Sequence, residues 1–476
     1  MNIFFLPTLI FFSSSILLYF LYKHKSILIK TTYISGFIIL LISDYGSFVF
    51  NNVSRNLGIQ LSLDYNNKLI LLFFFILSFI TYTLFFRKKE KYFLMIFLIL
   101  NGAIINFFQS RDYFNIYVSL ELISMSLFLL VAYEKKVKMV WASLKYMIFS
   151  SVALNLYLIS IAILYSNTGT LNLIENLAFD KPLFFQTFLV SSLLIKSGVF
   201  FLSGWVIDVQ SYSTPGVSAI LTGVVEKMGL WMLFLIFPSF NKGTIDFLLI
   251  FAIVTLFLSY TYLLFQHNIK KIFAISTMSQ VSYGLLVIIF SREIFVYFFI
   301  YHMITKGFIF ILVDKFFTEK RIITLEDLKR KIIRYDIYLM FFILIFNLTG
   351  AYPSILYIIK KNIELGFFLN IVLLLVGIFF EKIMDNIHIE EKYKKINHII
   401  IPGLFLIIFI NLYFQNIEIR EILFGLVFLV VGALSYKFFK NKINLKEINI
   451  FSFTNNLIYI LGFVLMIMIF ELKGMI

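Results

Sequence analysis

The chain has 476 residues, of which 61% are hydrophobic, 19% aromatic and only 14% charged, with a net charge of +15. A soluble globular domain is about half apolar and about a quarter charged, so this composition excludes a soluble protein and indicates a polytopic membrane protein. The chain has no cysteine, which excludes disulfides, thiolate metal sites and cysteine-bound iron–sulfur clusters on this chain.

Apolar runs long enough to cross a bilayer recur along the whole chain. A spanning helix needs about 20 mostly apolar residues, and the sequence predicts sixteen candidates. They run near residues 1–22, 28–46, 66–86, 91–109, 112–133, 141–165, 183–206, 214–237, 244–266, 271–290, 294–314, 336–363, 366–384, 398–415, 421–438 and 455–472. The first run lacks a basic start and a small-residue cleavage site, so we expect a retained helix and not a signal peptide.

The positive charge is concentrated in odd-numbered connections between these helices. These connections contain KHKSILIK, RKKEK, EKKVK, NIKK, EKR…LKRKIIR, EKYKK and KFFKNKINLK, whereas the even-numbered ones hold single basic residues. By the positive-inside rule the basic connections are cytoplasmic. We therefore expect both termini on the outer side of a prokaryotic plasma membrane, with an even number of helices, sixteen or fourteen. The charge is a topology signal and does not indicate nucleic-acid binding.

Ionisable side chains inside the predicted helices carry the functional signal, because a charge at membrane depth is costly and usually marks a functional site. Glu121 and Lys196 lie near the middle of their helices, too far from either end for snorkelling, and are candidate partners. The alternatives are a protonated glutamic acid that serves packing and a structural ion pair. Lys227 is also central, and its neighbour Glu226 points about 100° away on the helix, so at least one of the two needs a partner elsewhere.

Further candidates lie in other helices. His302 and Lys306 are four residues apart on one helix face and suit a proton relay, with a polar helix–helix contact as the alternative. Lys145 lies near the cytoplasmic start of its helix beside Trp141, where a snorkelling anchor is equally compatible. Lys360 lies in the twelfth helix, and a simple loop pair with its neighbouring lysine is its alternative.

Two groups of five helices can be compared with each other. Helices 4–8 and 9–13 form two units, and an odd number of helices inverts the second unit in the membrane. The seventh and twelfth helices then correspond, and each carries a lysine and a break-prone run, IKSGVFFLSGW in one and TGAYPS in the other. The predicted regions are 1–90 (helices 1–3), 91–240 (first repeat), 241–385 (second repeat) and 386–476 (C-terminal helices).

Seven segments then carry a resemblance when they are taken together and in order. They are RDYFNIYVSLELISMSLFLLVAY, ASLKYMIFSSVALNLYLISIAILY, LLIKSGVFFLSGWVID, VSAILTGVVEKMGLW, NIKKIFAISTMSQVSYGLL, HMITKGFIF and TGAYPS…K. The chain resembles the antiporter-like proton-channel family over roughly residues 90 to 365. This family comprises the D-type subunits of Mrp sodium/proton antiporters, related subunits of membrane-bound hydrogenases, and the large membrane subunits of respiratory complex I.

The resemblance implies a fold of about fourteen helices with two inverted five-helix repeats. Together with the sixteen apolar runs, it leads us to expect an all-α polytopic membrane protein of about 14–16 transmembrane helices, with broken helices 7 and 12. It also implies a proton path along the middle of the membrane, without a cofactor or metal on this chain, inside an assembly with other membrane subunits. Carried over by motif, the proton path comprises Glu121, Lys196, Lys227, His302, Lys306, Lys360 and Lys145.

The mechanism expected from this set starts with Lys196 held protonated by Glu121. When Glu121 is drawn away, Lys196 releases its proton, which passes through Lys227 towards the second repeat. H⁺ is the expected ion and Na⁺ a second candidate. A Mrp-type antiporter subunit is favoured, and a redox-driven pump of the hydrogenase or complex I type is the alternative. A lipid-linked saccharide flippase and a scaffold that has lost the path are the remaining hypotheses.

The chain also departs from the family pattern at several positions. Trp205 and Asp208 match the segment after helix 7, but Ile207 and Gln210 stand where the family usually has proline and histidine. Glu226 is an additional acid beside the helix-8 lysine. We therefore expect a divergent member of the family.

Overall fold

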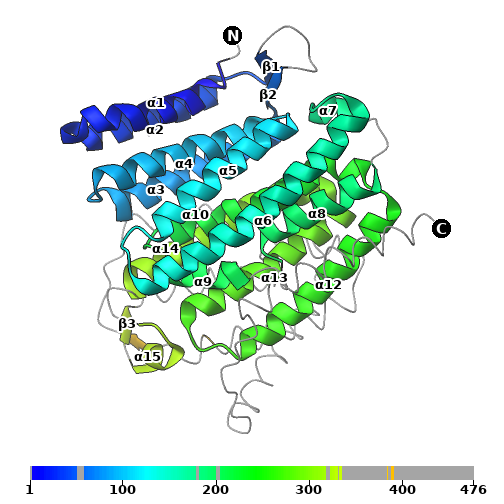
Figure 1. Cartoon of the computed structure of the whole chain (residues 1–476). Coiled ribbons are helices and arrows are strands. Elements are labelled where there is room, and N and C mark those ends of the chain that lie inside the picture. Colours follow the sequence, from blue (N-terminus) through cyan, green and yellow to red (C-terminus); the bar gives the residue numbers. More distant parts are fainter. Residues whose placement is uncertain are drawn as a thin grey trace, which may run out of the picture. The chain divides into compact units, whose positions relative to one another are not determined.

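A computed structural model describes residues 3–50, 58–177, 182–199, 204–317, 322–330, 332–334, 383 and 388–390. Figure 1 shows that this part of the chain is almost entirely helical. All eleven helices predicted up to residue 314 are found there. The helices predicted from residue 336 onward, and with them the predicted helix 12, lie outside the described residues.

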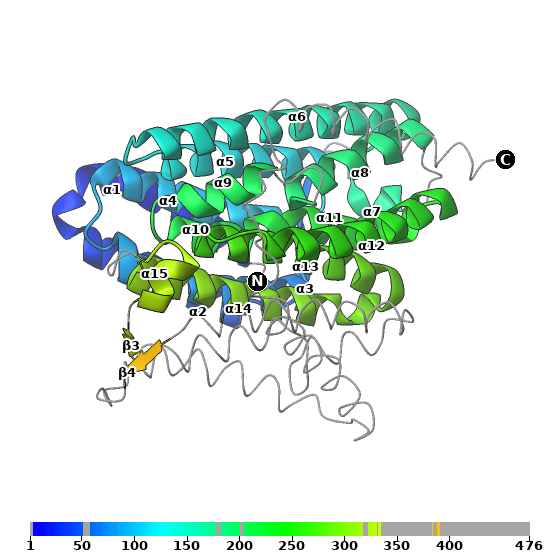
Figure 2. The same cartoon turned by 90° about the horizontal axis from the view of Figure 1, so that it is seen from below.

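The main elements follow the predicted order. The helices are α1 (Leu6–Phe20), α2 (Lys25–Ile42), α3 (Tyr65–Thr81), α4 (Lys91–Gln109), α5 (Tyr113–Val131), α6 (Val137–Thr168), α7 (Leu173–Asn176), α8 (Leu183–Ser197), α9 (Gly204–Tyr212), α10 (Val217–Gly223), α11 (Met228–Ile236), α12 (Lys242–Leu264), α13 (Ile269–Phe290), α14 (Phe295–Leu312) and α15 (Leu325–Arg330). Strands β1 (Gly46–Phe50) and β2 (Ile59–Leu63) pair antiparallel, and β3 (Ile332–Arg334) pairs in parallel with β4 (His388–Glu390). Figure 2 shows α15 beside these two short strands.

Within the described residues, nine helical segments have the length and composition of membrane spans, and α1 and α8 are shorter apolar helices. Helices are the natural result of such apolar runs, because in lipid every backbone polar group must be satisfied within its own segment. Polar residues fix where several helices begin. Asp64 accepts a hydrogen bond from the backbone N–H of Asn67 at the start of α3, and Asp112 accepts one from Asn115 at the start of α5.

The described residues divide into two compact units, one up to Leu248 and the other from Leu249 onward. The first unit contains α1 to α11, and within it α6 packs against both α5 and α8. The second unit contains α13 and α14, which pack against each other. Each unit therefore presents its own set of buried ionisable side chains.

Two of the predicted spans in the first unit are interrupted. Helix α8 ends at Gly198 in a left-handed conformation, with a φ angle of +68°, and α9 begins at Gly204 within the run expected to break the seventh helix. The eighth predicted span is broken as well, since α10 and α11 are joined by the 3₁₀ turn η4 (Val225–Lys227). The sequence did not predict this second break. The inverted relation of the two repeats stays a prediction.

Candidate functional site

Lys196 lies in the last turn of α8 and is only 6% exposed. Its ammonium nitrogen donates to the hydroxyl of Ser124 on α5 and to the hydroxyl of Ser150 on α6, both at 2.5 Å. The Ser150 hydroxyl donates in turn to Ser124 at 2.8 Å, and Ser124 donates to the carbonyl of Leu120 at 2.6 Å. The buried ammonium is thus hydrogen-bonded to a short chain of neutral hydroxyl groups, which connects three helices.

Glu121 lies one turn before Ser124 on α5 and is half-buried. The direct ion pair expected between Glu121 and Lys196 is not formed, and Glu121 acts on the ammonium only through a longer-range electrostatic attraction. Glu121 and Ser124 are three residues apart, so the two acceptors are separated by about 4.5 Å along the helix axis. The Lys196 ammonium lies at Ser124 and not at Glu121.

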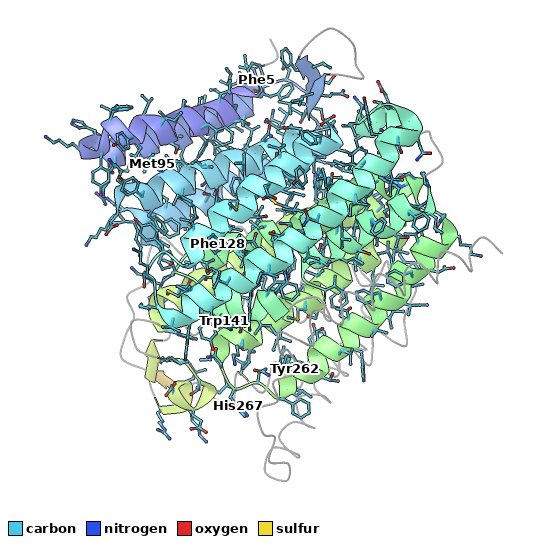
Figure 3. The ribbon with its side chains drawn as sticks, in the orientation of Figure 1. Phe5, Met95, Phe128, Trp141, Tyr262 and His267 are labelled. Carbon is cyan, nitrogen blue, oxygen red and sulfur yellow. The ribbon has the colours of Figure 1, made fainter. Side chains whose placement is uncertain are left out.

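Lys145 forms an ion pair with Asp208 at 2.5 Å and therefore joins the start of α6 to α9. Its ammonium also lies 5.9 Å from the centre of the Trp141 ring. Figure 3 labels Trp141 at the end of α6 away from α7. Sequence left Lys145 open between a membrane anchor and a member of the proton path, and the structure gives it a specific carboxylate partner.

The neighbouring residue Tyr146 lies close to Lys196. Its ring is 5.9 Å from the Lys196 ammonium and 5.1 Å from the ring of Trp205 on α9. The Trp205 indole N–H donates to the carbonyl of Ile195 in α8 at 3.2 Å. A side chain at Gly198 would collide with Val206 of α9. The two halves of the broken helix are therefore fixed to each other and to α6.

Lys227 is 1% exposed and donates to the carbonyls of Thr222 and Gly223, the latter at 2.8 Å. Both carbonyls belong to the end of α10, and the break before α11 leaves them available. A cation at a helix C-terminus is stabilised by the helix dipole. The sequence predicted Lys227 but gave no reason for its burial, and the helix break supplies that reason.

Glu226, the additional acid, is 1% exposed and accepts a hydrogen bond from the side-chain amide of Gln210 on α9. Glu226 thus has a partner on another helix, as its angular separation from Lys227 led us to expect. Close by, Gly229 of α11 meets the Leu193 carbonyl and the Ser197 hydroxyl of α8, and leaves no room for a side chain. The segment with Lys227 therefore packs next to the end of the helix that carries Lys196.

In the second unit, His302 and Lys306 lie one turn apart on α14, and both are buried. The Lys306 ammonium donates to the Phe273 carbonyl at 3.0 Å and to the Ser276 hydroxyl, both on α13. The His302 ring stacks at 5.9 Å on Phe298. Lys306 is thus hydrogen-bonded to α13. The predicted Lys360 lies outside the described residues.

Sequence reasoning missed an ion pair and three hydroxyl acceptors. Lys270 at the start of α13 pairs with Asp314, whose side chain is fully buried. The acceptors Ser124, Ser150 and Ser276 carry no charge and resemble any serine in an apolar helix, so no sequence signal separated them from packing residues. Among the described residues no group of three or more His, Cys, Asp or Glu side chains is arranged to hold a metal ion.

With the site described, its relation to known proteins can be stated. Residues 110–384, more than half of the chain, match the family described as NADH:quinone oxidoreductase/Mrp antiporter, transmembrane. The chain belongs to this family. The resemblance seen in the seven segments is thereby confirmed.

Two curated relatives illustrate the range of the family. The chain is 28% identical over 209 residues to the N-type subunit of NADH-quinone oxidoreductase from Desulforudis audaxviator, which covers 41% of this chain and 42% of that protein. It is 26% identical over 306 residues to the D-type subunit of a Na(+)/H(+) antiporter from Alkalihalophilus pseudofirmus, which covers 60% of this chain and 61% of the relative. The similarity thus spans about half the length of these proteins.

Solved structures share the fold over nearly the whole chain. A chain of the membrane-bound sulfane sulfur reductase, an archaeal respiratory membrane complex, superposes with a TM-score of 0.76 at 19% identity, covering 91% of this chain and 98% of that one. A chain of the Mrp complex from Dietzia sp. DQ12-45-1b gives 0.73 at 16% identity, covering 100% and 97%. The predicted polytopic antiporter-like fold is confirmed.

Proposed function

We propose that this chain is a proton-translocating subunit of a multisubunit membrane assembly and that Lys196 is its central proton carrier. The observation that carries the proposal is the environment of the Lys196 ammonium. It is buried, and its hydrogen-bond acceptors are two neutral serine hydroxyls. A charge removed from water without a paired counter-charge is costly, so this position favours release of a proton.

Glu121 supplies the opposite state. A carboxylate next to the ammonium favours its charged form, and Glu121 is only one helical turn from Ser124. In the proposed cycle Lys196 takes up a proton while it lies against Glu121, then moves about 4.5 Å along α5 to Ser124 and Ser150 and releases it. The described arrangement corresponds to the second position, in which lysine and glutamate are apart.

The remaining predicted carriers extend this path. Lys227 lies in the segment that packs next to the end of α8, and His302 with Lys306 forms the corresponding set in the second unit. Lys360 is proposed as the last carrier. We propose a route along these residues through the middle of a prokaryotic plasma membrane, with both termini on the outer side.

The host assembly is proposed to be of the Mrp cation/proton antiporter type, because the match to the D-type antiporter relative extends over 306 residues, compared with 209 for the N-type oxidoreductase relative. A redox-driven respiratory complex is the second candidate. It is favoured by the fold shared with the sulfane sulfur reductase complex. The same proton carriers serve in both candidate assemblies. Na⁺ stays a candidate ion only for the Mrp-type antiporter.

The test is proton transport by the whole assembly in inverted vesicles, with Lys196→Ala, Lys196→Arg and Glu121→Gln compared at equal amounts of assembled complex. Arginine keeps the charge and the donors but does not release a proton in proteins. Loss of about a hundredfold or more, the range of a positioned proton-transfer group, is expected in all three variants. Lys136→Ala is the matched control, because Lys136 is largely exposed and pairs with Glu134 at the start of α6.

Transport in Lys196→Arg equal to that of the parent would contradict the proposal, because a permanently charged side chain would then suffice. Sodium-driven against redox-driven proton movement in the same vesicles separates the two hosts.

A further inference from the structure

We propose that Glu226 is a further proton-carrying residue, which receives the proton of Lys196 and delivers it to Lys227, and that Gln210 positions it. The inference rests on the proposed function and adds a carrier that the family pattern does not contain. It starts from two departures from that pattern, Gln210 in place of a histidine and Glu226 as an additional acid. The structure shows that these two residues are hydrogen-bonded to each other.

The location of Glu226 suits a carrier. It lies in the 3₁₀ turn between α10 and α11, and its side chain is buried. Its neighbour Lys227 donates to the carbonyls of Thr222 and Gly223, and the carboxylate and this ammonium also attract each other electrostatically. A buried carboxylate held close to a buried lysine can take up a proton and pass it on.

Helix α8 provides the connection towards Lys196, because the turn η4 packs against this helix. The Tyr146 ring lies 5.9 Å from the Lys196 ammonium, and its buried hydroxyl has no hydrogen-bond partner among the described residues. The turn with Glu226 and Lys227 therefore packs against the end of α8 that carries Lys196, and this contact brings the proposed donor and acceptor into one part of the first unit.

The proton balance follows these groups. The Lys196 ammonium loses one proton and becomes a neutral amine, while the Glu226 carboxylate gains one proton and becomes a carboxylic acid. Glu226 then gives this proton to a neutral Lys227 amine and returns to the carboxylate. No electron, metal or further reactant takes part.

Helix α9 gives Gln210 its role as a positioning residue. The same short helix carries Trp205, which donates a hydrogen bond to a backbone carbonyl of α8, and Asp208, which forms an ion pair with Lys145 of α6. The amide of Gln210 projects from this fixed helix to the Glu226 carboxylate, so the orientation of Glu226 depends on the same helix that closes the Lys196 site. A movement of α9 would change both ends of the transfer together.

The experiment compares proton transport by the assembled complex in vesicles for Glu226→Gln and Gln210→Leu. Glutamine at position 226 keeps an oxygen that accepts from Gln210 but cannot carry a proton, whereas leucine at position 210 removes the hydrogen bond and leaves the carboxylate. A carrier role predicts a loss of about a hundredfold or more for Glu226→Gln and a smaller loss for Gln210→Leu, which leaves the carboxylate in place. A role limited to the hydrogen bond predicts the reverse order, and that result would overturn the inference.

A second pair of variants guards against a failure of assembly. Glu226→Asp keeps a proton-binding carboxylate, and Glu226→Asn has the same size without one, so the inference expects activity only in the former. Equal transport by these two variants would overturn it. Lys196→Ala is measured alongside. If this variant transports protons like the parent, the proposed function is wrong. If Lys196→Ala loses transport but Glu226→Gln transports normally, only the inference about Glu226 is wrong.

Discussion

The two units hold their central lysines in different ways. In the first unit, Lys196 is bound by side-chain hydroxyls from two helices, with Glu121 one turn away. In the second unit, Lys306 is bound by a backbone carbonyl and one hydroxyl of a single helix, α13. A backbone carbonyl is fixed in place by its helix, whereas serine side chains rotate between partners. We therefore expect the first site to change partners more readily than the second.

The largest expected effect comes from removing the hydroxyl acceptors of each lysine. Replacing both Ser124 and Ser150 by alanine deletes two hydrogen bonds to a charged group, worth about 1.5–3 kcal/mol each, and transport should fall at least tenfold. Ser276→Ala leaves the Phe273 carbonyl in place, so a smaller reduction than in the double serine variant is expected. Initial rates of proton transport by the assembled complex measure both. Equal losses in the two variants would mean that the two lysines are held equivalently.

The second comparison concerns the ion pairs at the starts of α6 and α13. Lys270→Gln takes the lysine away from Asp314, whose side chain is fully buried, and we expect it to lower stability by about 3 kcal/mol. Asp208 is 23% exposed in its side chain, so Lys145→Gln should cost about 1 kcal/mol or less. Thermal unfolding of the purified assembly shows which variant loses more stability. A larger loss in Lys145→Gln than in Lys270→Gln would contradict the burial argument.

A third prediction asks how much the first site depends on close helix approach. Gly229→Ala places a methyl group against the Leu193 carbonyl and Ser197, and separation of α11 from α8 should cost about 1–3 kcal/mol. The matched control is Gly102→Ala, because the three atoms nearest to the added methyl group there all belong to the Phe12 ring, which can turn aside, and none is backbone. Similar melting temperatures for the two variants would show that α8 and α11 adapt without strain.

The smallest effect is expected at the edge of the first unit, outside the membrane spans. Burial raises the pKa of Glu134, but hydrogen bonds and charges from Lys136 and Lys89 outweigh it and lower the pKa below its usual value. A carboxyl with a lowered folded-state pKa stabilises the fold above its unfolded pKa and loses this contribution as the pH falls through the folded value. The melting temperature should therefore fall slightly more steeply in acid for the parent than for Glu134→Gln. Parallel curves would show that these surface pairs contribute nothing.

The sequence predicted the membrane fold well because its main signal is one-dimensional. Each apolar run of about 20 residues must become a helix in lipid, so the eleven helices up to residue 314 could be placed without any knowledge of their packing. The break in the seventh helix was also visible, since Gly198 permits the left-handed conformation that ends α8. The break at Val225–Lys227 was not predicted, because no proline or glycine lies within that turn, and the flanking Gly223 and Gly229 were not recognised as a break.

The sequence predicted the charged residues of the candidate site but did not predict which groups they contact. Glu121, Lys196, Lys227, His302 and Lys306 stood out because an ionisable residue at membrane depth needs a reason. Only the tertiary structure decided that Lys196 lies on Ser124 and Ser150 and apart from Glu121, and that Gln210 holds Glu226. These contacts join helices far apart in sequence, and the acceptors are neutral side chains and carbonyls that any apolar helix contains. The amino-acid order thus determined which residues are charged within the membrane, and the packing of broken helices determined what each charge touches.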